Sequence, residues 1–537
     1  MQPLRLATST LLICLAAWTP AVAGATTSAD QDLVGVWADL KIDSQHEQVS
    51  PLEQSLLDDA AAGRLDECSL LEAALIAEGV SDRGELDRLL NEFDRWAGRL
   101  GSRQALPVDA NDRELAADVL EFLHGQLLLR GPGYDSDCSR MSEALEGGAF
   151  NCVSATLLFN CLAAELGLDA VAVEVPGHVF SRVVSAEQEF DVETTCRSWF
   201  ARGEAAARRA ELPGRGIHSR DETDGVANPG RVLTDAQLLA IIYYNRGVHC
   251  LSRRQFAQAF GAFRRAAALD PESSSIRGNL LAAVNNWALD LSGHGRFQQA
   301  VDLLERGRRA APEHRSFEVN YAAVLQAWLE SLYAEHNFET AVSIIRRAAE
   351  TMPDEPFFRV AWLDAHRRWG RRLILDDHSA AATALFDRML GPLADASDVR
   401  AVEAAALNDA ALEFLAEHDF QAAIALLGLG CRRQPANPLL ADNYRAAVMH
   451  WADDAFARGD YAEAVRRTHV ALARTPDDAA LRGNVRYGYH RWLAQLESAG
   501  QHAVARGVLD QARLGDPHSP LWEDWSARLM TSEGSRQ

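Results

Sequence analysis

A cysteine, a histidine and an acidic residue follow one another in an order that suits nucleophilic catalysis. Cys152 comes directly after a loop of small residues (147–149), His178 follows a Pro-Gly pair, and Asp191 lies further along the chain. In such a set, a thiolate attacks a carbonyl carbon, an imidazole carries the proton, and a carboxylate on the far ring nitrogen orients the imidazole. The order therefore predicts Cys152 as nucleophile, His178 as base and a carboxylate on the next predicted strand, Asp191 or Glu193, as orienting acid.

The elements that must position these residues follow from residue periodicity and from turn-forming residues. An apolar segment with a glycine after it predicts a helix, and alternating valines predict strands. The predicted elements are a helix at 153–166 ended by Gly167, strands at 171–175, 178–184 and 190–194, and a turn at 185–188. Cys152 would then lie at a helix N-terminus, where unpaired N–H groups and the helix dipole favour a thiolate.

Three alternatives at this site stay open. Glu193 could replace Asp191 as the third member, although the two sit on alternate positions of one predicted strand with Val192 between them. The backbone N–H of Cys152 would form half of an oxyanion hole, and Gln126 and Asn151 are the candidates for its second donor. A single cysteine in an apolar helix is also commonly a small buried hydrophobe with no chemical role.

These residues resemble the transglutaminase-like superfamily, and most closely its bacterial branch with the SirB1-type core. The resemblance covers roughly residues 65–200 and implies a papain-like α+β fold with a Cys-His-Asp triad. On the matching motifs, Cys152 would be the nucleophile, His178 the base and Asp191 the acid, which the family pattern prefers over Glu193. Some members of this branch keep the fold and lack the cysteine. The matching pieces are Asn-Cys-Val-Ser at 151–154, Leu-Gly-Leu at 166–168, Pro-Gly-His-Val-Phe at 176–180 and Asp-Val-Glu-Thr-Thr at 191–195.

Length, charge and cysteine spacing restrict the class of protein. A chain of 537 residues is too long for one hydrophobic core, so several domains are expected. Its formal net charge of −23 argues against a nucleic-acid partner and against attraction to anionic lipid. No Cys-x-x-Cys or His-x-x-x-His spacing occurs, so neither a metal nor a cofactor is expected.

The first 23 residues have the pattern of a secretory signal peptide. Arg5 supplies a positive charge, 11–18 form a short apolar stretch, and Ala21-Val22-Ala23 fits a cleavage site. We therefore expect an exported protein, periplasmic or extracellular, with no membrane-spanning segment after cleavage. An uncleaved N-terminal anchor is the alternative. Seven cysteines would remain after cleavage, and an odd count leaves at least one free thiol.

Composition divides the rest of the chain into a helical lobe, a catalytic core, a linker and a long C-terminal part. Residues 24–50 form a loose lead-in. Residues 51–130 carry apolar side chains at spacings of three and four, which predicts helices, including one from about 113 to 129. The core spans 131–200, and 201–236, rich in Gly, Asp, Asn and Pro at 214–231, predicts a linker or a flap over the site.

The C-terminal part, 237–530, is an internal repeat with a period of 41 residues. Alanine, proline, tryptophan and aromatic positions all recur at this period, and the alanine series is complete over seven units. A fixed period over seven units predicts a stacked helical array. The alanines are Ala259, Ala300, Ala341, Ala382, Ala423, Ala464 and Ala505, and the tryptophans are Trp287, Trp328, Trp369, Trp451 and Trp492.

Within each unit the pattern resembles the second helix of a tetratricopeptide (TPR) repeat. The resemblance implies an all-α solenoid whose groove holds a protein or peptide partner. Forty-one residues exceed the usual ~34, and the surplus of close to two helical turns would lengthen the first helix of each pair. Asn279, Asn320, Asn443 and Asn484 would lie on those longer helices. The repeated tryptophans would be inter-repeat core, or alternatively ligand platforms.

Two functions are compatible with this organisation. The first is an exported cysteine-dependent hydrolase or acyltransferase that acts on a peptide or amide through a thioester, with the repeats recruiting substrate or partner. The second is a binding scaffold in which the core is structural and the repeats carry the function. The presence of all three triad residues favours the first.

Overall fold

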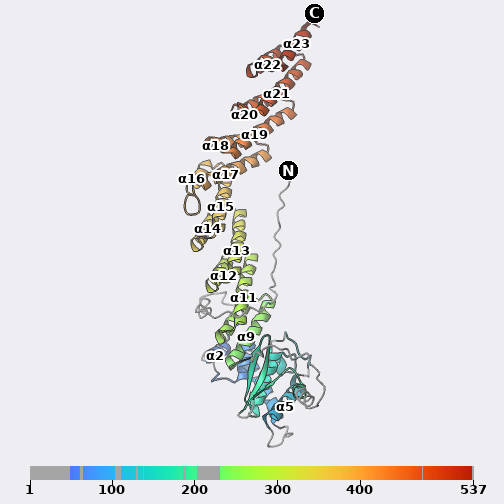
Figure 1. Cartoon of the computed structure of the whole chain (residues 1–537), viewed down its shortest axis with the longest axis vertical. Coiled ribbons are helices and arrows are strands. Elements are labelled where there is room, and N and C mark those ends of the chain that lie inside the picture. The colour runs from blue at the N-terminus through green and yellow to red at the C-terminus, as the bar shows by residue number, and fades with distance from the viewer. Residues whose placement is uncertain are drawn as a thin grey trace, which may run out of the picture. The chain divides into compact units, whose positions relative to one another are not determined.

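The computed structural model describes residues 49–60, 65–102, 111–128, 131–136, 138, 140–185, 189–201, 230–473 and 476–534 (Figure 1). The predicted signal peptide, most of the lead-in and most of the linker lie outside the described residues. The chain divides into two compact units, residues 1–325 and 326–537, and each is considered by itself. Helices predominate in both units.

Four helices form the N-terminal lobe of the first unit, as the sequence predicts. Apolar side chains at helical spacing bury one face of α4, whereas α3 is buried on nearly all sides. Side-chain caps start both helices: Ser69 accepts from the Glu72 N–H and Asp82 from the Glu85 N–H. The last helix changes type, because α5 continues as a π-helix, η2 (Leu123–Leu128), which the sequence pattern did not indicate. The α-helices are α2 (Pro51–Ala60), α3 (Leu70–Glu78), α4 (Arg83–Gly101) and α5 (Asp112–Phe122).

A four-stranded antiparallel sheet, in the order β3-β2-β1-β4, follows the lobe in sequence (Figure 1). Helix α7 packs against β1 and β2, and its apolar side chains share one core with the lobe. The predicted helix and the first two strands form where periodicity placed them, whereas the third strand, predicted at 190–194, ends earlier, at Val192. The elements are α6 (Met141–Leu145), α7 (Cys152–Glu165), β1 (Ala170–Val175), β2 (His178–Val184), β3 (Glu189–Val192) and β4 (Arg231–Val232).

Strand β4 lies inside the segment that composition predicted to be linker. Its Arg231 forms ion pairs with Glu174 on β1 (2.7 Å) and with buried Asp270 (2.6 Å). A guanidinium held by two carboxylates makes several charge-assisted hydrogen bonds at once, which fixes a short strand that has few backbone bonds of its own. The structured domain therefore extends past the linker to include β4.

Helix α9 (Asp235–Ser252), the first of the repeat region, is built into the same core as the N-terminal lobe. It packs on α3, and its buried apolar residues belong to the core cluster that contains α7. Glu53 of α2 is buried and lies 3.1 Å from Arg246 of α9 and 3.4 Å from Arg265 of α10 (Phe256–Leu269). The first helical pair and the lobe are thus tied by buried charge as well as by apolar contact.

Replacement of Glu53 by alanine is expected to lower the free energy of unfolding of this unit by about 3–5 kcal/mol, because Arg265 would stay buried without its counter-charge. Glu72→Ala, which removes a more exposed partner of Arg83, is the matched control and should cost at most about 1 kcal/mol. Urea unfolding of the full chain with hydrogen exchange at the α9 and α10 amides measures both. Equal losses in the two variants would contradict the prediction.

Helix pairs recur through the rest of both units with the period seen in the sequence. As expected from the long repeat, the first helix of most pairs has 20 residues and the second commonly 14. The pairs are α11 (Ser274–Gly293) and α12 (Phe297–Ala310), α13 (Arg315–Ala334) and α14 (Phe338–Thr351), α15 (Pro356–Leu375) and α16 (Ser379–Asp387), α17 (Ala396–Ala416) and α18 (Phe420–Arg433), α19 (Pro438–Ala457) and α20 (Tyr461–Leu472), and α21 (Ala479–Ser498) and α22 (His502–Gly515), before α23 (Leu521–Gly534).

The recurring asparagines join successive first helices by side-chain hydrogen bonds. Each donates to a residue 35 positions earlier, on the first helix of the preceding pair. Trp525 occupies the same repeat position and donates to His490 at 2.9 Å. A polar contact between neighbouring helices fixes their register. The bonds run from Asn279 to Tyr244, Asn320 to Asn285, Asn443 to Asn408 and Asn484 to the Met449 sulfur.

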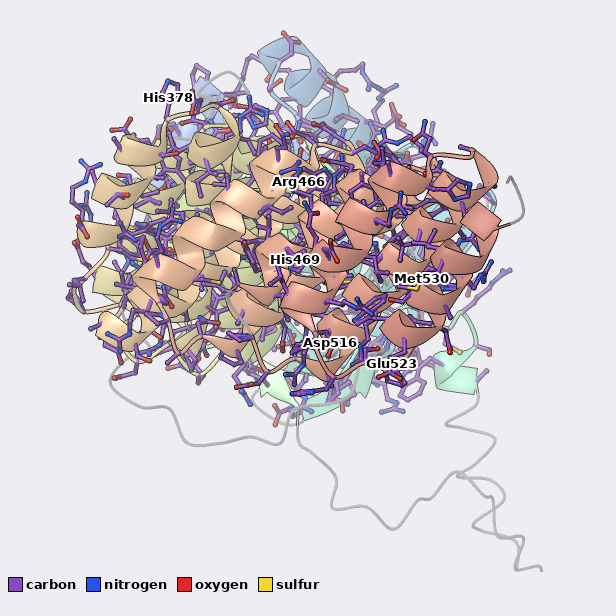
Figure 2. All side chains as sticks on the ribbon, turned by 90° about the horizontal axis from the view of Figure 1, so that it is seen from above. His378, Arg466, His469, Asp516, Glu523 and Met530 are labelled. Atoms are coloured by element: carbon purple, nitrogen blue, oxygen red, sulfur yellow. The ribbon has the colours of Figure 1, made fainter. Side chains whose placement is uncertain are left out.

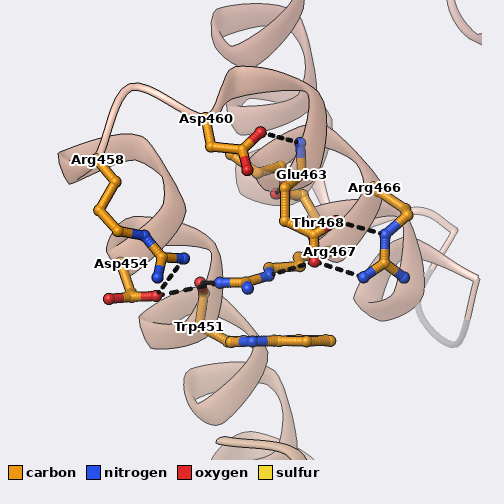
Figure 3. Close-up of polar contacts among 9 residues, drawn as sticks. Trp451, Asp454, Arg458, Asp460, Glu463, Arg466, Arg467 and Thr468 are labelled. Atoms are coloured by element: carbon orange, nitrogen blue, oxygen red, sulfur yellow. Dashed lines mark hydrogen bonds and ion pairs between the residues drawn. The ribbon is translucent and has the colours of Figure 1, made fainter. Parts of the chain in front are cut away.

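The recurring tryptophans are half-buried, so the prediction of an inter-repeat core holds only in part. At Trp451 the guanidinium of Arg467 covers the ring, 4.3 Å from its centroid (Figure 3). Arg467 also donates to the Trp451 carbonyl (2.6 Å), to Asp454 (3.2 Å) and to Glu463 (2.9 Å). At this position one face of the ring therefore packs against a guanidinium rather than against apolar side chains.

The fully buried tryptophans of the second unit lie at its C-terminal end instead. Trp522 and Trp525 of α23 are buried against α21 and α22. Met530, further along α23 and labelled in Figure 2, is 74% exposed. Helix α23 therefore caps the last pair with one apolar face. Among the described residues, no helix combines the length and apolar character needed to cross a membrane.

Candidate active site

Cys152 is the first residue of α7, as the sequence predicts. Asn151 caps this helix: its side-chain oxygen accepts the Ser154 N–H at 3.0 Å, and the Ser154 hydroxyl accepts the Asn151 N–H at 3.0 Å. This reciprocal box leaves the thiol at the start of the helix, where the N–H groups of the first turn lack intrahelical partners. Apart from the Ser154 N–H, which Asn151 accepts, these N–H groups can donate to negative charge on sulfur or on a bound carbonyl oxygen.

The loop before Cys152 must be made of small residues because other backbone passes very close to it. Gly147 has a φ of +79°, which favours glycine, and a Cβ on Gly148 would lie 2.9 Å from the Glu143 carbonyl oxygen. A Cβ on Gly131 would lie 2.2 Å from the Gly147 carbonyl oxygen. The backbone around Gly131 therefore packs directly against the loop 147–149 that precedes Cys152, here called the nucleophile loop.

His178 is presented by a tight turn between β1 and β2. Val175 pairs with His178 across Pro176-Gly177, and Gly177 has a φ of +79°. Proline followed by glycine with positive φ is the sequence of a type II turn. The His178 ring interacts with the Cys152 thiol on one side and, through Nε2, forms a hydrogen bond to Glu193 Oε2 at 2.7 Å on the other. The imidazole thus bridges the thiol and a carboxylate.

Electrostatics at the pair favour a thiolate and an imidazolium. Burial alone would raise the pKa of the Cys152 thiol. The interaction with His178 and the bonds from the Val179 and Val153 N–H groups together outweigh burial, so the pKa lies below its ordinary value. The bonds to Cys152 and then to Glu193 raise the pKa of His178 to about 10. Between the two pKa values, both groups carry charge.

Several other described cysteines have a pKa shifted in the direction opposite to that of Cys152. Burial raises the pKa of the thiols of Cys68, Cys138, Cys161 and Cys250. Within the described residues, Cys152 is the cysteine whose pKa is lowered, and its sulfur is not in a disulfide. A thiol with a low pKa, half-exposed and beside an imidazole has the environment of a reactive cysteine.

The structure corrects the prediction of Asp191 as the orienting acid. Asp191 pairs across the strands with Arg182, and its carboxylate accepts from the Arg182 guanidinium at 2.6 Å. Arg182 lies four residues along β2 from His178, roughly 13 Å at the rise of an extended strand. Glu193, the alternative weighed from the sequence, holds His178 instead. Strand register decides between two carboxylates on the same face.

Residues next to Glu193 hold its carboxylate in place. Glu193 Oε1 accepts from the N–H of Thr195 at 3.1 Å and from its hydroxyl. Thr194 is fully buried, bonded through its hydroxyl to Thr156 of α7 (2.9 Å) and through its carbonyl to His124 Nε2 (2.9 Å). Burial lowers the pKa of His124, which favours the neutral ring with Nε2–H as donor. Sequence reasoning missed His124, whose signal was a polar residue inside an apolar helix.

The two side chains predicted as second oxyanion donors, Asn151 and Gln126, lie in different environments. Asn151 uses its side-chain oxygen to cap α7, and its residue is buried. Gln126 lies on the exposed side of η2. Neither has a described contact with the Cys152 sulfur.

Together, the described residues form a thiol–imidazole–carboxylate series in the order Cys152, His178, Glu193. Such a series can deliver a thiolate to an acyl carbon and carry the proton that the reaction moves. Within the described residues, no group of three or more His, Cys, Asp or Glu side chains is arranged to hold a metal ion.

Comparisons with known proteins identify no family for the chain. No family model and no curated protein matches. Solved TPR structures align with it: the TPR2AB domain of yeast Sti1 in a complex with pHSP90 (14% identity, 47% of this chain and 98% of that chain, TM-score 0.17) and a tetratricopeptide repeat protein from Parabacteroides merdae (12%, 54% and 98%, TM-score 0.16). A third is YrrB, described as a TPR protein with an unusual peptide-binding site (17%, 37% and 89%, TM-score 0.15). Scores this low carry no structural argument, so the repeat rests on the helix pairs and their period.

Proposed function

We propose that the protein is a cysteine-dependent amide hydrolase or acyltransferase of the transglutaminase-like type. The observation that carries this proposal is the continuous series from the Cys152 thiol through His178 to Glu193, with the thiol at a helix N-terminus. A buried structural cysteine needs no imidazole partner, and a structural histidine needs no thiol. The third member in this proposal is Glu193 rather than Asp191.

The reaction proceeds in two stages. The Cys152 thiolate attacks the carbonyl carbon of an amide, a C–S bond forms, and the carbonyl electron pair moves to oxygen. When the C–N bond breaks, His178 gives its proton to the leaving amine, and a thioester remains on Cys152. His178, now neutral, takes a proton from water, whose oxygen attacks the thioester carbonyl carbon. The C–S bond then breaks, the electron pair returns to sulfur, and the acid leaves while the Cys152 thiolate and the His178 imidazolium are restored. An amine in place of water gives acyl transfer.

Glu193 and the helix N-terminus act on different charges in this sequence. The Glu193 carboxylate fixes the ring and stabilises the imidazolium when His178 carries two protons. The N–H groups at the start of α7 stabilise the thiolate before attack and the oxyanion after it. The two devices keep negative charge on the reacting atoms and positive charge on His178.

The repeats would recruit a protein or peptide to this enzyme. Paired helices at a fixed period form a solenoid surface, the usual way such arrays hold an extended partner. Export is part of the same proposal, since the first 23 residues have the pattern of a signal peptide. The enzyme would then act on partners outside the cytoplasm.

Acetylation by p-nitrophenyl acetate tests the catalytic part. We expect a burst of p-nitrophenolate, with one acetyl group located on Cys152 by mass spectrometry, that is lost in Cys152→Ala. Cys250→Ala, which removes a half-buried thiol with a raised pKa, is the matched control and should keep the burst. A burst that persists without Cys152, or its absence in the unaltered protein, would overturn the enzyme and leave the binding scaffold as the account of the chain.

A further inference from the structure

The segment 131–135 is held against the nucleophile loop by backbone bonds. Tyr134 forms a bridge with Phe150, in which the Phe150 N–H donates to the Gly133 carbonyl (3.2 Å) and the Asp135 N–H to the Phe150 carbonyl (2.8 Å). The close approach of Gly131 to Gly147, where a Cβ would not fit, brings the two chain segments together. The backbone therefore places Tyr134 beside Phe150, which precedes Cys152 by two residues.

The side chain of Tyr134 extends from this bridge to the reactive sulfur. Its ring stands edge-on to Phe150 with centroids 5.9 Å apart, and its phenol lies close enough to Cys152 for the two side chains to interact. Phe150 in turn packs edge-on against His124, which supports Thr194 beside Glu193. Yet Tyr134 is 53% exposed, a high value for a large ring that the backbone fixes. The phenol thus faces both the sulfur and the solvent from which a substrate would arrive.

We propose that Tyr134 is a catalytic residue: its phenol is the second donor of the oxyanion hole, beside the backbone N–H of Cys152. The proposal rests on the proposed function and deepens it. In the tetrahedral intermediate the oxyanion lies only two bonds from Sγ, so a donor that lies beside the sulfur can turn to that oxygen with a small rotation. This role matches neither Gln126 nor Asn151, which have no described contact with the sulfur.

The environment keeps the phenol in the form that can donate. Burial, and then the negative charges of Cys152 and Glu193, raise the pKa of Tyr134 above its ordinary value. The phenol therefore stays protonated over the range in which Cys152 and His178 form a charged pair. A neutral phenol that turns from the sulfur to the developing oxyanion keeps a donor on the negative charge as that charge moves from sulfur to oxygen during the attack.

Two electrophiles separate this role from a general effect on the thiol. Acetylation by p-nitrophenyl acetate passes through an oxyanion, whereas alkylation by iodoacetamide is a direct displacement at carbon and forms none. For Tyr134→Phe, which removes only the hydroxyl, we expect acetylation of Cys152 to slow by roughly 10²-fold. Alkylation at pH 7 should change by less than about threefold, because His178 still holds the thiolate.

The matched control is Tyr487→Phe on α21, a tyrosine with the same 53% exposure in the second unit, which should leave both rates unchanged. Equal slowing of both reactions in Tyr134→Phe would show that the residue acts on the thiol alone and would overturn the inference. Faster acetylation would show that the phenol shields the sulfur, with the same consequence. If the unaltered protein shows no Cys152-dependent acetylation, the proposed function itself fails, and the two failures are thus distinguished.

Discussion

Replacement of His178 by alanine is expected to slow both stages of the reaction with p-nitrophenyl acetate, and the second stage more. Without the imidazolium, Cys152 returns toward an ordinary thiol, of which about 3% is thiolate at pH 7, so the burst should slow by up to about 30-fold. Hydrolysis of the thioester loses its general base and should slow by roughly 10²–10⁴-fold. Stopped-flow absorbance gives the burst, and the steady state gives the hydrolysis.

The control for this variant is His294→Ala, which removes an exposed histidine of the same unit. It should leave the burst and the steady state unchanged. If His178→Ala retained the rate of thioester hydrolysis, another group would be the base, and the role given to His178 would be wrong. Near-UV circular dichroism of each variant verifies that the fold is kept.

Replacement of Glu193 by glutamine is expected to lower turnover by roughly 10²–10⁴-fold, whereas Asp191→Asn should change it by no more than about twofold. Glutamine keeps the size of Glu193 but removes the charge that stabilises the His178 imidazolium and fixes its tautomer. Asp191 pairs instead with Arg182 at the edge of the sheet. Steady-state kinetics of the two variants measure the difference.

The pH dependence of the Glu193 variant carries a separate signature. The bond to Glu193 is one of the causes that raise the pKa of His178 to about 10, so its loss should move the upper limit of the imidazolium toward lower pH. Activity that needs His178 as an acid should then decline at a lower pH than in the unaltered protein. If Asp191→Asn lost more turnover than Glu193→Gln, Asp191 would be the orienting acid, as the family pattern prefers, and the role given to Glu193 would be wrong.

The sequence was sufficient to place Cys152 and His178, the proposed nucleophile and base, on their elements. Glycine and small residues before Cys152, the apolar helix after it, and Pro176-Gly177 before His178 are local signals, and each depends on backbone geometry near one residue. The acidic partner of His178 cannot be identified from such local signals. Choosing between Asp191 and Glu193 required the register of β2 against β3.

That register could have been obtained from the predicted turn. A four-residue connection at 185–188 pairs Val184 with Glu189 and, counting outward, Arg182 with Asp191, as the structure has it. An arginine opposite an aspartate satisfies both charges and frees Glu193 for His178. Tyr134 and His124 offered no comparable signal, because a bridge between distant segments and a π-helix have no simple sequence period.

The repeat was clear from the sequence because one structural unit recurs many times. The period gave the helix pairs and the longer first helices, since spacing repeated in every unit reflects packing. The burial of each tryptophan was less accessible, because it depends on neighbours such as Arg467, whose guanidinium covers Trp451. Side-chain partners that differ from unit to unit are not encoded in the period.

The most direct test of the central claim is the pH profile of iodoacetamide alkylation, measured by mass spectrometry at each cysteine in the unaltered protein and in His178→Ala. The account predicts that Cys152 reacts at pH 6, where an ordinary thiol is only about 0.3% thiolate, and that this advantage is lost without His178. Cys250, whose pKa burial raises, should react only at alkaline pH in both proteins. A Cys152 that follows the same profile as Cys250, or that is unaffected by His178→Ala, would contradict the thiolate–imidazolium pair.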